Sequence, residues 1–191
     1  MKNIYIIGAG NIGSRHLQSL NKIDQEISLN VLDPNSNSLA LAKQRFETLP
    51  KNNYIQSINF NRVIEKSHDT IDIAIIATNS DVRRTVVEQL ISAHTVRYLI
   101  LEKIAFQNSK DFCSIIKLLA DNKIKAWVNC SRRAYSSYQK IQSKINNNDI
   151  VNFSVIGGCW GLGCNSIHMI DLFSLLNSSS DLQIDISHLD K

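Results

Sequence analysis

Two patterns of apolar and polar positions alternate along the first two thirds of the chain. Short apolar runs rich in β-branched residues predict buried strands, and longer segments with apolar residues at helical spacing predict amphipathic helices. Strands are predicted at residues 2–7, 28–33, 54–60, 71–77, 98–101 and 124–129. Helices are predicted at residues 14–23, 38–46, 61–67, 80–93 and 109–122. This alternation indicates an α/β fold with a Rossmann-type, doubly wound parallel sheet and right-handed crossovers.

The pattern changes after Asn129. The elements predicted beyond it are a helix at residues 132–146, a strand at residues 151–156 and a helix at residues 165–176. We therefore expect a first domain at residues 1–129, followed by a second, partial α+β domain at residues 130–191.

A glycine-rich turn follows the first predicted strand and leads directly into a helix. In a GxGxxG turn, Gly8 would let the chain leave the strand sharply, Gly10 would let a pyrophosphate approach the backbone, and Gly13 would let the helix pack on the strand. The N–H groups and positive dipole end of the helix would face the phosphates. The residues that this motif proposes for a dinucleotide are Gly8, Gly10, Asn11, Ile12 and Gly13.

Asp33 stands at the end of the second predicted strand. Its carboxylate would accept hydrogen bonds from the adenosine ribose hydroxyls and would repel a 2′-phosphate. No Arg or Lys follows within DPNSNS, residues 33–38, so the sequence favours NAD over NADP. The alternative is a glycine-rich turn in an α/β domain that binds no nucleotide.

Polar residues follow two other predicted strands. Thr78 and Asn79 come after the run at residues 71–77, and Glu102 and Lys103 come after YLIL. Ligands of open parallel sheets bind beyond the carboxyl ends of the strands, so Lys103 would hydrogen-bond a substrate hydroxyl and assist its deprotonation. Alternatively, Lys103 only ends its strand and reaches solvent.

His168 and Asp171 are spaced to share one face of the last predicted helix. Histidine titrates near neutral pH and can transfer a proton, and the carboxylate of Asp171 would orient it. The alternative is a histidine at the edge of the core that hydrogen-bonds the backbone.

The composition is that of a globular protein, with 43% hydrophobic and 20% charged residues. The net charge of +4 is spread along the chain, which argues against a nucleic-acid partner. No apolar stretch reaches membrane-spanning length, and the first strand begins at once, so neither membrane nor signal peptide is expected. The four cysteines form no CxxC pair, which predicts reduced thiols, a cytoplasmic location and no metal site.

With these residues assembled, the chain resembles the glucose–fructose oxidoreductase and inositol dehydrogenase family, Gfo/Idh/MocA. GAGNIGSRHLQSL at residues 8–20 resembles the first turn and helix of that family, and ATNS at residues 77–80 resembles the segment after its fourth strand. LEK at residues 101–103 resembles its Glu-Lys-Pro motif, and GG followed by HMIDL at residues 168–172 resembles its second-domain site. The order and spacing of these motifs cover nearly the whole chain.

The resemblance implies an NAD(P)-dependent oxidoreductase that acts on a hydroxyl or carbonyl group of a sugar, a cyclitol or a nucleotide-linked sugar. It implies Lys103 and His168 as acid/base residues, with Asp171 beside the histidine. The residues that it places along the cofactor are Gly8, Gly10, Gly13, Asp33, Asn79 and Glu102. By the same resemblance, the second domain would bind the substrate and would form the contact of a homo-oligomer.

Three differences from the family leave a second hypothesis open. Ile104 stands where the family has Pro, and Cys164 stands where many members carry Asp. Roughly sixty residues follow the last parallel strand, whereas the substrate domain of the family needs more than about a hundred. The alternative is therefore a catalytically silent or truncated dinucleotide-binding module, either regulatory or a remnant. A scaffold that binds another protein through an exposed sheet edge is a third hypothesis.

Overall fold

The computed structural model describes residues 1–67, 69–146, 149–179, 181–185 and 187. The chain divides into two compact units, Met1–Asn129 and Cys130–Lys191. No helix in the described residues combines the length and apolar character that crossing a membrane requires.

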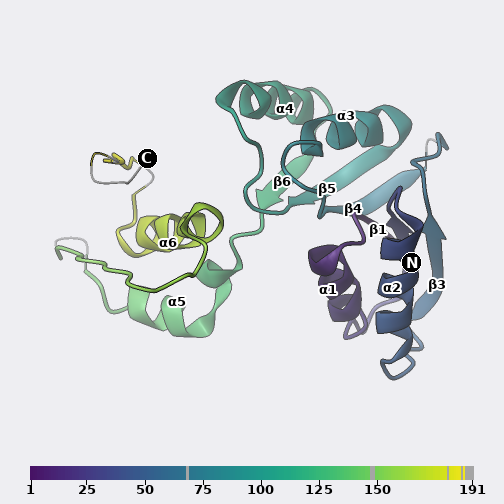
Figure 1. The fold of residues 1–191 in the computed structure, drawn as a ribbon, viewed down its shortest axis with the longest axis horizontal. Coiled ribbons are helices and arrows are strands. Elements are labelled where there is room, and N and C mark those ends of the chain that lie inside the picture. Colours follow the sequence, from purple (N-terminus) through teal and green to yellow (C-terminus); the bar gives the residue numbers. More distant parts are fainter. Residues whose placement is uncertain (68, 147–148, 180, 186, 188–191) are drawn as a thin grey trace. The chain divides into compact units, whose positions relative to one another are not determined.

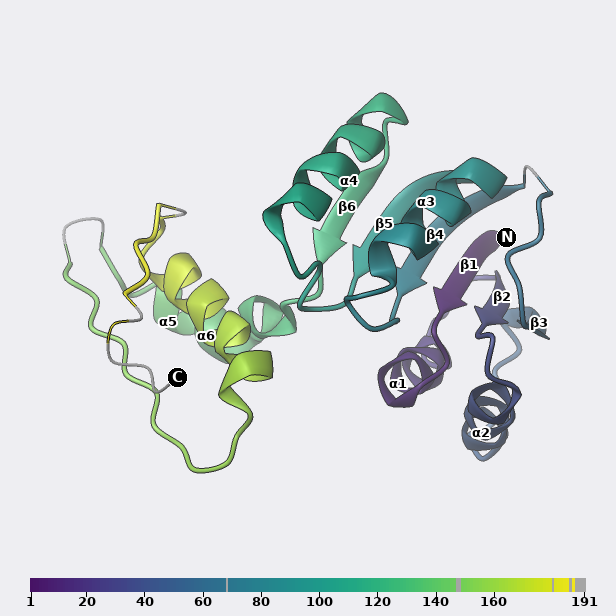
Figure 2. The same cartoon turned by 45° about the horizontal axis from the view of Figure 1, so that its top comes forward.

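The first unit is built on a sheet of six parallel strands in the order β3-β2-β1-β4-β5-β6 (Figure 1). The strands are β1 Lys2–Ile7, β2 Ile27–Leu32, β3 Ile55–Asn61, β4 Thr70–Ile76, β5 Thr95–Leu101 and β6 Lys125–Val128. Each overlaps a predicted strand, and Figure 2 shows that successive strands are turned relative to one another. Because all the strands run the same way, their carboxyl ends meet at one edge of the sheet.

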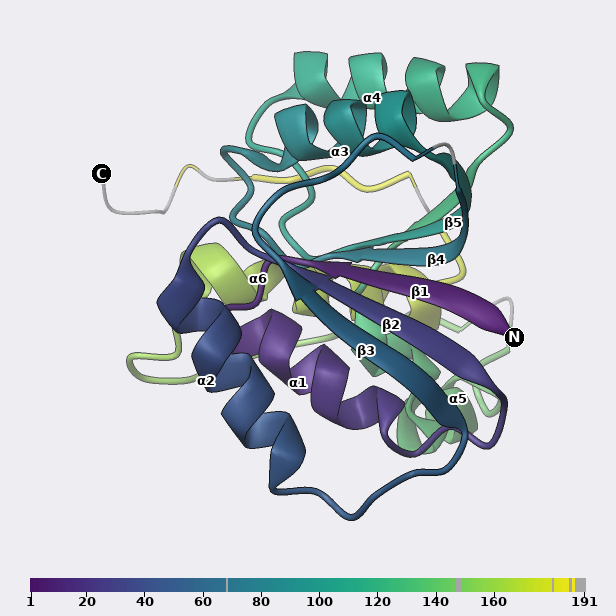
Figure 3. The same ribbon diagram turned by 90° about the vertical axis from the view of Figure 1, so that its right-hand side faces the viewer.

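Helices cover both faces of this sheet. They are α1 Asn11–Leu20, α2 Ser36–Glu47, α3 Arg83–Ala93 and α4 Ser109–Asp121. Figure 3 shows α1 and α2 on one face and α3 and α4 on the other. The sheet is therefore doubly wound, as the sequence predicts.

Apolar side chains fill the space between the helices and the sheet. Ile6, Leu17 and Leu29 are fully buried on the side of α1 and α2, and Ile76 and Leu90 are fully buried on the side of α3 and α4. Burying each of these side chains contributes about 1.5–3 kcal/mol to folding. The two cores hold the strand ends in fixed positions, and those ends carry the polar residues described below.

One part of the sheet carries amide side chains instead of apolar ones. Asn59 on β3 donates to Asn30 on β2 at 3.1 Å, and Asn30 donates to Asn3 on β1 at 3.0 Å. The helix predicted at residues 61–67 is wrong, because β3 ends at Asn61 and the residues after it form no helix. Asn61 still pairs with Leu32 of β2, and Arg62 Nε donates to the carbonyl oxygen of Pro34, so the start of this segment continues beside β2 instead of turning into a helix.

The second unit contains a short 3₁₀ helix, η1 Ser131–Ala134, followed by α5 Ser136–Gln142 and α6 Leu162–Leu176. The single helix predicted at residues 132–146 is wrong. Tyr135 interrupts it with extended backbone, at φ −72° and ψ 129°, so the i to i−4 hydrogen bonds cannot continue through this point.

The strand predicted at residues 151–156 is also wrong, because these residues form neither strand nor helix. The side chain of Ile156 is 98% exposed. A strand needs a neighbour to satisfy its backbone N–H and C=O groups, and the described residues of the second unit contain no strand that would pair with it.

Candidate functional site

A sharp glycine turn joins β1 to α1. Gly8 has φ +95°, and an added β-carbon would lie 2.8 Å from backbone atoms of Ala77 and Thr78. A β-carbon on Gly13 would lie 1.7 Å from the carbonyl oxygen of Gly8, whereas one on Gly10 would have no atom of the described residues within 4 Å. Two of the glycines therefore allow close backbone packing, and the third leaves open space in front of the helix.

The first turn of α1 presents its backbone N–H groups at this turn. Among the described residues, no side chain caps the helix, and its first turn contains no acidic residue. The helical hydrogen bonds begin where Ser14 donates to the carbonyl oxygen of Gly10 at 2.9 Å. The preceding N–H groups of Asn11, Ile12 and Gly13, together with the positive end of the helix dipole, form a site suited to an anion.

Asp33 lies beside the same turn. One carboxylate oxygen accepts from the backbone N–H of Ala9 at 2.7 Å, and the other accepts from the N–H of Asn35 at 2.8 Å. These charge-assisted bonds fix the carboxylate at the end of β2. Each oxygen retains a further lone pair, so the side chain remains able to accept a hydrogen bond from a ligand hydroxyl.

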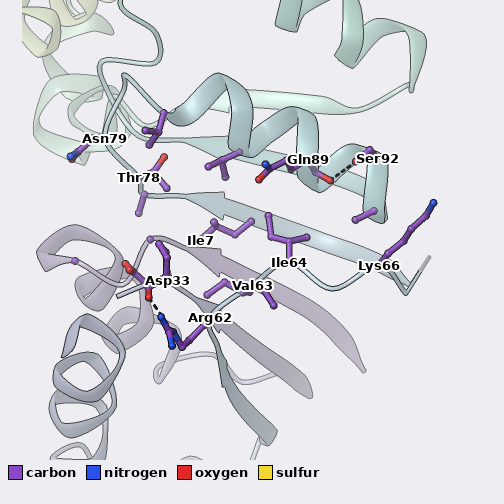
Figure 4. Close-up of a pocket in the computed structure, with 18 residues that line it drawn as sticks. Ile7, Asp33, Arg62, Val63, Ile64, Lys66, Thr78, Asn79, Gln89 and Ser92 are labelled. Atoms are coloured by element: carbon purple, nitrogen blue, oxygen red, sulfur yellow. Dashed lines mark hydrogen bonds between the residues drawn. The ribbon is translucent and has the colours of Figure 1, made fainter. Parts of the chain in front are cut away.

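A cavity of about 900 Å³ opens at this edge of the sheet (Figure 4). Its walls come from the ends of β1, β2 and β4, from α3 and from the segment after β3. The predicted cofactor-binding residues that line it are Gly8, Gly10, Asp33, Thr78 and Asn79. The predicted residues outside its lining are Asn11, Ile12, Gly13 and Glu102. The hydroxyl oxygen of Thr78 is buried and has no hydrogen-bond partner within the described residues, which suits contact with a ligand.

The cavity also contains residues that the sequence reasoning missed. Arg62, Val63 and Ile64 follow β3, and Figure 4 shows them facing the cavity from the opposite side to Thr78. Their position after a predicted strand could have indicated that they lie at the site. The helix predicted at residues 61–67 placed them on a helix instead, so they were not considered as site residues.

Glu102 is buried, with 7% of its surface exposed, and two side chains bind it. His16 Nε2 lies 2.7 Å from Glu102 Oε1, and Asn129 Nδ2 donates to the same oxygen at 2.6 Å. Burial favours the neutral carboxyl, but the bonds from His16 and Asn129 and the charge of Arg83 outweigh it, so the pKa of Glu102 lies below its ordinary value. The charged Glu102 therefore joins α1 to the ends of β5 and β6.

Arg83 is a buried cation that hydrogen-bonds to two loops. It is 2% exposed and donates to the carbonyl oxygens of Thr78, Glu102 and Ile104, and to that of Ala105 at 3.0 Å. These carbonyls belong to the segments after β4 and β5. The sequence reasoning missed this role, because a charged residue at the start of a helix usually faces solvent.

Lys103 is half-buried in the segment that Arg83 holds, directly after Glu102. The peptide bond between Lys103 and Ile104 is cis. Lys103 belongs to the first unit, whereas His168 and Asp171 belong to the second, so the combined role predicted for the three residues stays a prediction.

In the second unit, Asp171 is held by an arginine of η1. Arg133 donates to both carboxylate oxygens, with contacts of 2.6 and 2.9 Å, and the hydrogen bonds to Asp171 raise the pKa of Arg133. Arg132 contacts the sulfur of Met169 at 3.9 Å. His168 is half-buried on the same helix, α6. The sequence assigned the carboxylate of Asp171 to orienting His168, and the structure gives it a strong partner in Arg133.

The sequence of this chain matches a known protein family. The profile of an oxidoreductase family with an NAD-binding Rossmann fold, Gfo/Idh/MocA, matches residues 2–130. The chain belongs to this family. The predicted family and fold are thus confirmed, and NAD is the cofactor that the family binds, as predicted. A comparison with curated proteins gave no match.

Solved structures show the same fold at low sequence identity. An Agrobacterium radiobacter oxidoreductase in complex with NAD⁺, L-tartaric acid and magnesium has a TM-score of 0.69 at 15% identity, over 92% of this chain and 54% of that one. Myo-inositol 2-dehydrogenase from Lactobacillus plantarum has a TM-score of 0.66 at 19% identity, over 93% and 56%. The WlbA dehydrogenase of Thermus thermophilus, in complex with NAD and UDP-GlcNAcA, has a TM-score of 0.67 at 16% identity, over 92% and 63%. This chain therefore spans between about half and two thirds of the length of these structures.

Proposed function

We propose that this chain binds NAD and serves in the oxidation or reduction of a hydroxyl or carbonyl group on a sugar, a cyclitol or a nucleotide-linked sugar. The observation that carries the proposal is the site where Gly10, the uncapped first turn of α1 and Asp33 meet at one cavity. The family supports the cofactor. The substrate class draws support from the inositol dehydrogenase and from the complex with UDP-GlcNAcA.

The residues at the cavity suit the parts of a dinucleotide. The pyrophosphate would approach over Gly10, where the described residues leave open space, and would accept hydrogen bonds from the N–H groups of α1. Asp33 would accept from the adenosine ribose, and the hydroxyl of Thr78 would gain the partner that it lacks within the described residues. Bound NAD supplies the acceptor for the hydride of the substrate C–H bond.

The acid/base assignment extends to both units. Lys103 would donate a hydrogen bond to the substrate oxygen and lower the cost of its negative charge, and His168 would accept the hydroxyl proton. Asp171 would act on His168 indirectly, by fixing α6 to η1 through Arg133.

Calorimetric titration with NAD and NADP, followed by a panel of polyols, sugars and nucleotide sugars scanned for absorbance of reduced cofactor, tests the proposal. We expect NAD to bind and one class of substrate to give a signal. Lys103→Ala and His168→Ala should abolish that signal, whereas Lys110→Ala, at the exposed start of α4, should leave it unchanged. Turnover that survives both substitutions would contradict the assigned roles.

A dinucleotide-binding module without turnover is the second candidate function. It is favoured by the second unit, whose described residues contain helices and no strand, and by the engagement of Asp171 with Arg133. Tight binding of NAD with no signal on any substrate would support this candidate and exclude the enzyme.

Two further expectations belong to the same proposal. A cytoplasmic location follows from the cysteine spacing, which suits a reducing compartment. A homo-oligomer follows from the family resemblance, and light scattering on the purified chain tests it by giving the mass of the particle in solution.

A further inference from the structure

The ends of β2 and β3 bring two opposite charges to the same end of the cavity. Leu32 pairs with Asn61 in the parallel register, so the next residues along each strand, Asp33 and Arg62, are neighbours. The N–H of Asp33 donates to the carbonyl oxygen of Asn61 at 3.1 Å. In return, Arg62 Nε donates to the carbonyl oxygen of Pro34 at 3.2 Å.

Both side chains line the cavity, and Figure 4 shows Arg62 beside Asp33 and below Val63. The bond to Pro34 uses one donor of the guanidinium and fixes where the group lies. Its two terminal amino groups carry four further donors, and no hydrogen bond from them is recorded in the described part of the chain. A cation with available donors therefore lies next to the carboxylate that would bind the ribose.

The sequence favours NAD because no Arg or Lys follows Asp33 within residues 33–38. Residues 33–38 form only the segment after β2. Strand pairing brings Arg62 next to Asp33 from the segment after β3. This end of the cavity therefore carries a positive charge that residues 33–38 do not contain.

The two charges act in opposite ways on a 2′-phosphate. A carboxylate repels the phosphate and accepts from a 2′-hydroxyl, whereas a guanidinium binds phosphate oxygens through two parallel hydrogen bonds. The repulsion from Asp33 is reduced here, because Ala9 and Asn35 donate backbone hydrogen bonds to its two oxygens. The pair therefore offers one partner for a 2′-hydroxyl and another for a 2′-phosphate.

We propose that Arg62 is a specificity-determining residue that binds the 2′-phosphate of NADP, so that this chain prefers NAD but also accepts NADP. The inference rests on the proposed dinucleotide site. Asp33 sets the preference for NAD, and Arg62 limits how large that preference becomes.

Calorimetric titration of the whole chain with NAD, NADP, ADP and 2′,5′-ADP tests this inference without any substrate. In Arg62→Ala, the affinity for NADP and 2′,5′-ADP should fall about tenfold or more, whereas the affinity for NAD and ADP should change less than about threefold. Arg62→Lys should retain part of the affinity for NADP, because it keeps the charge but loses the planar fork.

Matched variants separate this effect from a change in net charge. Arg97→Ala removes the same charge from β5, where Arg97 pairs with Asp72, and should leave the ratio of the two affinities unchanged. Asp33→Ala should turn the preference toward NADP, because Arg62 remains. The double variant Asp33→Ala/Arg62→Ala should show little preference. Thermal melts of all variants establish that each one folds.

The outcomes distinguish the inference from the proposed function. If Arg62→Ala lowers the affinities for NAD and NADP equally, or lowers neither affinity, Arg62 does not bind the 2′-phosphate. The inference is then wrong, although the proposed NAD site is unaffected. If wild-type protein binds NAD but not NADP at millimolar concentration, the inference is also wrong. If wild-type protein binds neither nucleotide, both the inference and the proposed site are wrong.

Discussion

The imidazole of His16 and the carboxylate of Glu102 lie 2.7 Å apart, although 86 positions separate them in the chain. The contact joins the second turn of α1 to the segment that follows β5, and Asn129 completes it from the end of β6. The glycine turn and the Lys103 segment are thus connected by one buried carboxylate. We therefore expect stability and cofactor binding to depend on this part of the sheet edge.

The pKa of Glu102 makes part of the stability dependent on pH. Because its folded pKa is lowered, the charged carboxylate stabilises the fold fully above the ordinary value of 4.5, and this contribution is lost as the pH falls through the lower folded pKa. Glu102→Gln should therefore lower the free energy of unfolding by about 1–3 kcal/mol at pH 7. It should also flatten the decline in acid, as measured by denaturant unfolding at several pH values.

Glu88→Gln is the matched control for that measurement, because Glu88 is a half-exposed partner of Arg84. An exposed ion pair contributes about 0–1 kcal/mol, so the loss should be small. Equal losses in the two variants would show that burial of Glu102 does not matter.

Arg83 is predicted to stabilise the loops after β4 and β5. Arg83→Met should lower the free energy of unfolding by about 2–4 kcal/mol, because it leaves the carbonyl oxygens of Thr78, Glu102 and Ile104 without their donor. The neighbouring Arg84→Met removes solvent-exposed ion pairs with Glu88 and Asp111, which water and salt screen, so it should lower the free energy of unfolding much less than Arg83→Met does. Urea unfolding of both variants tests this prediction. Similar losses in the free energy of unfolding would show that Arg83 does not stabilise the two loops.

Two glycines of the turn are predicted to differ in how much stability the protein loses when each is replaced by Ala. Gly13→Ala should destabilise the fold by about 1–3 kcal/mol or more, because its β-carbon would overlap the carbonyl oxygen of Gly8. Gly10→Ala should leave the melting temperature nearly unchanged, because Gly10 has φ −63° and open space around it. Thermal unfolding compares the two, and a large loss in Gly10→Ala would show that the space in front of α1 is needed for folding.

Arg133 and Asp171 are predicted to fix η1 to α6 as a pair. Arg133→Met and Asp171→Asn should each lower stability, and the double variant should lose less than the sum, with a coupling of about 0.5–1 kcal/mol. The value is modest because the arginine is about half exposed. Additive losses in denaturant unfolding would show that the two side chains do not act together.

The parallel sheet and the glycine turn could be predicted because their signals are local. Each strand is a short apolar run, and the turn needs glycine at Gly8 and Gly13, where a β-carbon would lie too close to neighbouring backbone atoms. The helix at residues 61–67 could not be excluded locally. The start of this segment is held beside β2 by the pairing of Asn61 with Leu32 and by the bond from Arg62 to Pro34, and these partners come from a distant part of the sequence.

The candidate site was partly predictable for the same reason. Asp33 was found from its place after a strand, whereas Arg62 reaches the same end of the cavity through strand pairing. Arg83 was missed because its partners are backbone carbonyls, which no residue pattern displays. The strand predicted at residues 151–156 had a suitable apolar pattern, but pairing depends on a neighbouring strand that the pattern does not contain.

Calorimetric titration of wild-type protein and Gly10→Ala with NAD tests the central claim most directly. We predict that NAD binds the wild type, and that Gly10→Ala folds normally but binds NAD at least about tenfold more weakly, because the new methyl group would occupy the space through which the pyrophosphate approaches. Equal affinity in the two proteins, or no binding of NAD to the wild type, would contradict it.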